Sequence, residues 1–102
     1  MSEIPVDMQA LRADIDALDE RLVALLGERQ KLVQAVARIK RAQTIPMRQP
    51  GRRAAVKAHV AELAAQRGLE PSYAQQLYDA IIVESCRLED LIIDGVAGDP
   101  NR

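Results

Sequence analysis

A long apolar repeat, uninterrupted by proline from Asp7 to Pro46, limits the possible folds to those that contain one very long helix. Apolar residues recur at spacings of three and four, which places them on one face of an α-helix. They are Met8, Leu11, Ile15, Leu18, Leu22, Leu25, Leu32, Val36 and Ile39. With Asp7 as N-cap, we expect a helix over about residues 7–42, roughly 54 Å long at 1.5 Å per residue. A chain of 102 residues cannot cover such a helix alone, so the pattern predicts a homodimer.

Two shorter helices are expected to follow a connector over residues 44–49. Pro50 fits the first turn of a second helix over about 50–67, which Gly68 ends. Pro71 opens a third helix over about 71–94, and Gly95 marks its end. The expected inward positions are Val56, Val60 and Leu63 in the second helix, and Leu77, Ile81, Ile82, Leu88, Ile92 and Ile93 in the third. The prediction is an all-α domain over 7–94 with a flexible N-terminus (1–6) and a disordered tail (95–102).

Composition narrows the functional classes. There is no Phe or Trp among 48% hydrophobic residues, which suits helices better than a β-sandwich. A net charge of -1 argues against nucleic acid as a partner. Cys86 is the single cysteine and His59 the single histidine, so we expect no intrachain disulfide, no metal site and a reducing compartment. No apolar run of membrane-spanning length and no leader is recognised, which favours a cytoplasmic protein.

Polar residues interrupt the apolar faces at informative positions. Arg29 lies on the seam of the first helix, and Lys40 follows eleven residues later, only about 20° further around it. Ser85 and Glu89 share a face inside the apolar stripe of the third helix. One interpretation is a structural ion pair between Arg29 and Glu89. The other is a polar pocket for an anionic ligand with carboxylate or phosphate groups, because Glu89 cannot neutralise Arg29, Lys40 and Arg52 together.

Arg12 adds a geometric argument for a shared site. It precedes Arg29 by seventeen residues, about 25 Å along the helix, so the two cannot hold one small ligand from the same helix. In an antiparallel dimer, Arg12 of the partner chain could reach the Arg29 site. Considered alone, Arg12 is better explained as a solvated surface residue.

The segments LRADIDALDERLVALLGERQKLVQAVARIK and IIVESCRLEDLI, joined by the proline connector, resemble the AroQ-type chorismate mutases. The resemblance covers about residues 8–93. It implies an intertwined, domain-swapped helical homodimer with two active sites, each built from both chains. It also implies a cofactor-free Claisen rearrangement of chorismate to prephenate.

The resemblance assigns roles to the charged positions. Arg12 matches an arginine donated by the partner, and Arg29 matches one that grips a substrate carboxylate. Lys40 matches a lysine that contacts a carboxylate and the breaking ether oxygen, and Arg52 an arginine at the start of the second helix. Glu89 matches the Gln or Glu that hydrogen-bonds the ether oxygen. Since a carboxyl group donates only when protonated, activity is expected to fall as pH rises.

The remaining site positions are Ser85, matching a hydroxyl near the ring carboxylate, and the apolar wall residues Val36, Ile82 and Cys86. Gln49 and Arg53 stand where these enzymes commonly carry Asp and Glu near the C4 hydroxyl. The MRQPGR and LYDAIIVESCRLEDLI segments are more similar to a specialised branch, the 4-amino-4-deoxychorismate mutases. An amide at position 49 can serve either an amine or a hydroxyl, so the 4-amino preference rests on resemblance.

Three other functions remain open at this point. The chain could be an ordinary chorismate mutase, or an isochorismate-pyruvate lyase, which shares the fold. It could also be a non-catalytic helical dimerisation module whose polar interruptions are structural or bind a regulatory metabolite.

Overall fold

The computed structural model describes residues 5–94, and these form three α-helices and no strand. They are α1 (Val6–Gln43), α2 (Arg52–Gln66) and α3 (Pro71–Ile93). The predicted all-α class with one long N-terminal helix is therefore confirmed. The chain divides into two compact units, Met1–Leu32 and Val33–Arg102. None of the described helices combines the length and the apolarity that a bilayer crossing requires.

The first unit consists of the N-terminal part of α1. The helix begins at Val6, because the N–H of Gln9 already donates to the carbonyl of Pro5 at 3.0 Å. Asp7 thus lies inside the first turn, where its carboxylate accepts a hydrogen bond from the Met8 N–H at 3.0 Å, and the prediction that it is the N-cap is wrong. The apolar repeat is present but exposed on this chain, and Leu11, for example, keeps 62% of its surface accessible.

In the second unit, the connector runs from the end of α1 to Gly51. Thr44 adopts a left-handed conformation with φ 56°, and the Ile45 N–H donates to the Lys40 carbonyl at 2.9 Å to close the helix. Gly51 is also left-handed, with φ 81°, and precedes α2 directly. A left-handed residue cannot lie within an α-helix, so α2 starts at Arg52 and the predicted place of Pro50 in its first turn is wrong.

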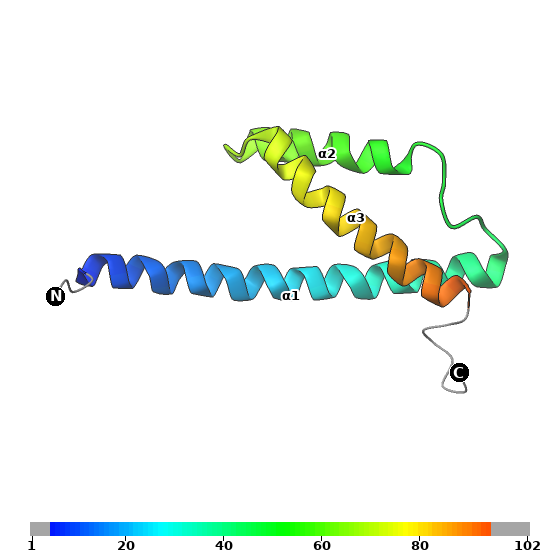
Figure 1. Ribbon diagram of the computed structural model, residues 1–102, viewed down its shortest axis with the longest axis horizontal. Coiled ribbons are helices and arrows are strands. Elements are labelled where there is room, and N and C mark those ends of the chain that lie inside the picture. The colour runs from blue at the N-terminus through cyan, green and yellow to red at the C-terminus, as the bar shows by residue number, and fades with distance from the viewer. Residues whose placement is uncertain (1–4, 95–102) are drawn as a thin grey trace, which may run out of the picture. The chain divides into compact units, whose positions relative to one another are not determined.

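Helices α2 and α3 form an antiparallel hairpin (Figure 1). Gly68, with φ 74°, ends α2 as predicted, and the Leu69 N–H donates to the Ala64 carbonyl at 2.8 Å. Pro71 occupies the first turn of α3, where its missing N–H has no helical partner to lose. The hairpin core consists of Val60, Ala64 and Ala74, with Val56 and Tyr78 packed against it.

The predicted inward positions are only partly buried. Ile82 and Ile92 are buried, whereas Leu63 and Leu77 remain 43% and 49% exposed. Leu63 and Leu77 lie at the margin of the single chain, because alanines at the core let the two helices approach. Their burial in the predicted homodimer stays a prediction. The predicted tail 95–102, with Gly95, and the first four residues of the predicted flexible N-terminus lie outside the described residues.

Candidate active site

The most sheltered ion pair among the described residues of the second unit joins the end of α1 to the end of α3. Lys40 Nζ lies 2.8 Å from Glu89 Oε1, and the two side chains are only 13% and 12% exposed. Lys40 belongs to the last turn of α1, where a cation complements the negative end of the helix dipole. The two residues are 49 positions apart, so helix packing alone brings these two sequence-predicted residues together.

Two further contacts hold the same region. Lys40 Nζ also donates to the main-chain carbonyl of Met47 at 2.5 Å, which links the ammonium to the connector. The neighbouring Arg41 donates from Nη1 to the Ile92 carbonyl at 3.3 Å, at the C-terminal end of α3. The Arg41 contact attaches α3 to α1 three residues beyond Glu89, and the Met47 contact ties the connector to the Lys40 ammonium. A side-chain pair held in this way can bind a ligand without first having to become ordered.

The buried face of α3 carries the other predicted site residues of that helix. Ile82, Ser85 and Glu89 are all buried, as their common face requires. Ser85 Oγ donates to the Ile81 carbonyl at 2.9 Å, a bond typical of hydroxyl side chains within helices. Its oxygen keeps acceptor capacity, so Ser85 can receive a hydrogen bond beside Glu89. Cys86 is half-buried on the flank of this face.

The connector side of the site is open. Arg52 and Gln49 are exposed, and their main chains meet in a hydrogen bond from the Arg52 N–H to the Gln49 carbonyl at 3.2 Å. Among residues 5–94 the Arg52 guanidinium makes no ion pair. Val36, one of the predicted wall residues, is 46% exposed. These groups are accessible to a ligand from solvent.

Arg12 and Arg29 lie in the first compact unit. Arg12 is exposed and Arg29 is half-buried. The acidic partner of Lys40 is Glu89, so the carboxylate that the sequence paired with Arg29 is bound by another cation. The predicted participation of Arg12 and Arg29 in the site stays a prediction.

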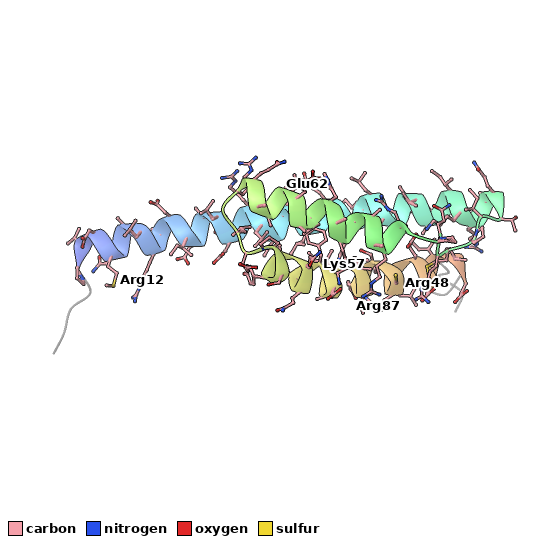
Figure 2. The ribbon with its side chains drawn as sticks, turned by 90° about the horizontal axis from the view of Figure 1, so that it is seen from above. Arg12, Arg48, Lys57, Glu62 and Arg87 are labelled. Atoms are coloured by element: carbon pink, nitrogen blue, oxygen red, sulfur yellow. The ribbon has the colours of Figure 1, made fainter. Side chains whose placement is uncertain are left out.

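Three arginines help to line an open pocket of about 230 Å³ next to this site, and no pattern in the sequence indicates it. The lining comes from the connector, the start of α2 and α3, and comprises Arg48, Arg53, Val83, Cys86, Arg87 and Asp90. Figure 2 shows Arg48 near the part of α3 that carries Arg87. Of these six, only Cys86 was predicted as a site residue. No periodic signal marks this lining, because its residues come from three separate segments.

Acidic residues neutralise much of the charge around this pocket. Arg87 makes two hydrogen bonds to Glu84, at 2.6 and 2.7 Å, a pair whose i, i+3 spacing could have been read from the sequence. These bonds lower the pKa of Glu84 and raise the pKa of Arg87. Asp79 lies 3.5 Å from Arg53 and 2.9 Å from Lys57, which reaches across from α2 (Figure 2).

The pKa of Asp79 is lowered below its ordinary value of 3.8, first by the Lys57 hydrogen bond, with partial burial acting in the opposite direction. Asp79 is therefore anionic at neutral pH and ties α2 to α3. Among the described residues, no group of three or more His, Cys, Asp or Glu side chains could hold a metal ion.

Comparison with known proteins identifies the family of this chain. The family model for chorismate mutase type II matches residues 11–90. A 4-amino-4-deoxychorismate mutase of Streptomyces venezuelae is 45% identical over 87 residues, which span 85% of this chain and 84% of that protein. A 4-amino-4-deoxychorismate mutase of Streptomyces pristinaespiralis is 42% identical over 83 residues, or 81% of this chain and 64% of that protein.

A more distant relative is the bifunctional chorismate mutase/prephenate dehydratase of Escherichia coli K12. It is 32% identical over 84 residues, which cover 82% of this chain and only 22% of that longer protein. The region matched by the family model, residues 11–90, includes both Lys40 and Glu89. This chain belongs to the chorismate mutase type II family of isomerases.

Proposed function

We propose that this protein is a 4-amino-4-deoxychorismate mutase, which rearranges 4-amino-4-deoxychorismate to 4-amino-4-deoxyprephenate without a cofactor. The observation that carries the proposal is the sheltered Lys40–Glu89 pair between α1 and α3. The names of the two Streptomyces relatives support the choice of substrate. In this proposal the product leads to p-aminophenylalanine and antibiotics derived from it, and the enzyme works in the cytoplasm.

The reaction explains why the site needs so few reactive groups. In a Claisen rearrangement the ether C–O bond breaks while a new C–C bond forms, and six electrons shift around one ring of atoms. No proton, hydride or external electron is transferred. The protein must therefore hold the substrate in its folded, reactive conformer and stabilise the negative charge that grows on the ether oxygen.

Lys40 and Glu89 supply that stabilisation. The Lys40 ammonium donates to the ether oxygen as the C–O bond lengthens, in surroundings where the charge is poorly screened by water. Glu89 can donate to the same oxygen only as the neutral acid. The fall of activity with rising pH that the sequence leads one to expect stays a prediction.

The substrate carboxylates need fixed cations on both sides. Arg29 grips one of them, and Arg12 of a second chain reaches the same site across a homodimer interface. Exposed apolar residues support the dimer, since Ile15, Leu18 and Leu22 are each more than half exposed on the single chain. A second copy that covers this stripe in an intertwined, domain-swapped arrangement would bury it and complete two equivalent sites.

Residues of the connector and α3 surround the ring of the substrate in this proposal. Arg52 and Gln49, both exposed, face its C4 end, and the Ser85 oxygen lies near the ring carboxylate. Ile82, Val36 and Cys86 form the apolar walls. The neutral Gln49 amide suits either an amine or a hydroxyl at C4. That ambiguity keeps chorismate mutase, the activity in the name of the Escherichia coli relative, as the second candidate.

A paired assay tests the substrate. The purified protein is incubated separately with 4-amino-4-deoxychorismate and chorismate, and the products are identified by chromatography and mass spectrometry. We expect an isobaric product from the amino compound and much slower conversion of chorismate. Preference for chorismate would replace the proposal by the second candidate. Release of pyruvate from isochorismate would indicate a lyase, and no conversion of any compound would indicate a non-catalytic module.

Mixing two inactive variants tests the shared site. Arg12→Ala and Arg29→Ala are each expected to lose most activity. In a heterodimer of the two, one site has both arginines intact and the other has neither. Random mixing should restore about a quarter of the sites, because half the dimers are mixed and each holds one complete site. If the mixture stays as inactive as its components, both arginines act from one chain or the sites are not shared.

A further inference from the structure

The connector contacts the Lys40–Glu89 pair through its main chain. Lys40 Nζ donates to the Met47 carbonyl at 2.5 Å and to Glu89 at 2.8 Å. A lysine ammonium has three N–H donors, so these two acceptors fix its direction and leave the third donor for a ligand. One of the acceptors is thus a main-chain atom of the segment between α1 and α2.

The chain turns back over residues 44–47, so that the Met47 carbonyl reaches the side chain of Lys40, seven positions earlier. Thr44 turns the chain through its left-handed conformation, φ 56°. The Ile45 N–H then bonds to the Lys40 carbonyl at 2.9 Å, which ties the turn to the residue it serves. Pro46 fixes its own φ and holds Ile45 extended. Ile45 and Met47 are both half-buried, so the segment is anchored against the unit at two points.

Thr44 is an unusual residue for this conformation. Helices that end with a left-handed residue normally place glycine or asparagine there, because a β-branched side chain crowds the backbone. Gly51 and Gly68 follow that rule in this chain, and Thr44 does not. Backbone strain of this kind persists where the surrounding structure determines it, and it clusters at functional sites.

We propose that residues 44–47 form a positioning element for Lys40. The Met47 carbonyl is the second acceptor that aims the ammonium at the reacting atoms, and the Thr44 turn and Pro46 hold this carbonyl in place. The consequence for catalysis rests on the proposed mutase function, whereas the restraint of the ammonium does not. A segment that only joined two helices would not need to bind the side chain of Lys40.

A double-mutant cycle tests this coupling. Pro46→Gly loosens the segment without removing any side-chain contact of the site. We expect it to lower kcat about tenfold with little change in KM, since small displacements of an aligned group are costly. In a Lys40→Ala background, the same substitution should change kcat by less than about twofold, because the group being positioned is already gone. An equal loss in both backgrounds would mean general loosening and would overturn the proposal.

A matched proline serves as the control. Pro71 begins α3 at the far end of the hairpin from the site, and Pro71→Gly adds similar chain freedom there. The kcat of Pro71→Gly should equal that of the parent protein. Urea unfolding of each variant at one protein concentration establishes that the comparison is made between folded proteins.

A second measurement does not depend on turnover. The chain has three lysines, Lys31, Lys40 and Lys57, so ¹⁵N NMR of the side-chain ammonium groups has few signals to assign. We expect slowed hydrogen exchange at Lys40 in the unliganded protein, loss of that protection in Pro46→Gly, and its retention in Pro71→Gly. Equal protection in Pro46→Gly would refute the positioning role even if the mutase activity is real. Protection that depends on Pro46 in a protein without turnover would uphold the role and remove the proposed function.

Discussion

Replacing Glu89 by alanine should be among the most destabilising single changes in the second unit. At 2.8 Å and an effective dielectric constant of about 20, the Lys40–Glu89 attraction is about 6 kcal/mol, most of which offsets the loss of hydration. Removing one partner of such a pair costs roughly 3–5 kcal/mol, because the other charge stays sheltered and uncompensated. The Met47 carbonyl still accepts from Lys40, and the side chain has some access to water. We therefore expect a loss of about 3 kcal/mol in the free energy of unfolding.

Urea unfolding followed by circular dichroism, at one protein concentration for all variants, measures this loss. Glu89→Gln keeps an acceptor of the same shape and should lose only about 1 kcal/mol. The matched control is Glu62→Ala, which removes an exposed carboxylate from α2 (Figure 2) and should change stability by no more than about 0.5 kcal/mol. If Glu89→Ala were no less stable than Glu62→Ala, the pair would contribute nothing to holding α3 on α1.

Three further results are expected. Glu89→Ala, which removes every hydrogen-bond donor at this position, should lower kcat by about a hundredfold, whereas Glu89→Gln, whose amide donates, should keep most of the parent activity. Equal losses in the two variants would exclude hydrogen-bond donation by residue 89. Gly68→Ala forces a side chain into a backbone conformation with φ 74° and should lower the free energy of unfolding by about 1 kcal/mol. Gly27→Ala, within α1, should raise the free energy of unfolding by up to about 1 kcal/mol. Thermal or urea unfolding measures the sign of each change. Asp79→Asn should lower the melting temperature at pH 5–7, and this difference from the parent protein should disappear as the pH falls below 3.8. A carboxyl whose pKa is lowered by folding stabilises the fold at pH values above its unfolded-state pKa and loses that effect when it is protonated. A difference that persists in acid would contradict the Lys57 contact as the source of the stabilisation.

The existence of three helices could be predicted because the signals are local. The apolar spacing in α1, the proline at the start of α3 and the glycine after α2 each act within a turn or two of the chain. The start of α2 was misplaced because Gly51, a residue with many allowed conformations, takes a left-handed one here. Sequence alone does not reveal which of these conformations a glycine adopts.

The candidate site divides in the same way. Lys40 and Glu89 stood out in the sequence because each interrupts an apolar face, and the resemblance to chorismate mutases added their roles. Their mutual contact did not follow from the pattern, which offered Arg29 as the partner of Glu89 instead. The Met47 carbonyl had no signal at all, since every residue carries a carbonyl and only the path of the chain aims one at an ammonium.

The amino-acid sequence by itself determined the helices, the family and the charged residues that make the chain a mutase candidate, because spacing and residue type act over short distances along the chain. The tertiary structure decided which charges meet. Packing of the α2–α3 hairpin carries Glu89 to the end of α1, and the left-handed turn at Thr44 returns Met47 to the same ammonium. These contacts join segments as much as 49 residues apart, and their geometry depends on the packing between helices rather than on any local preference.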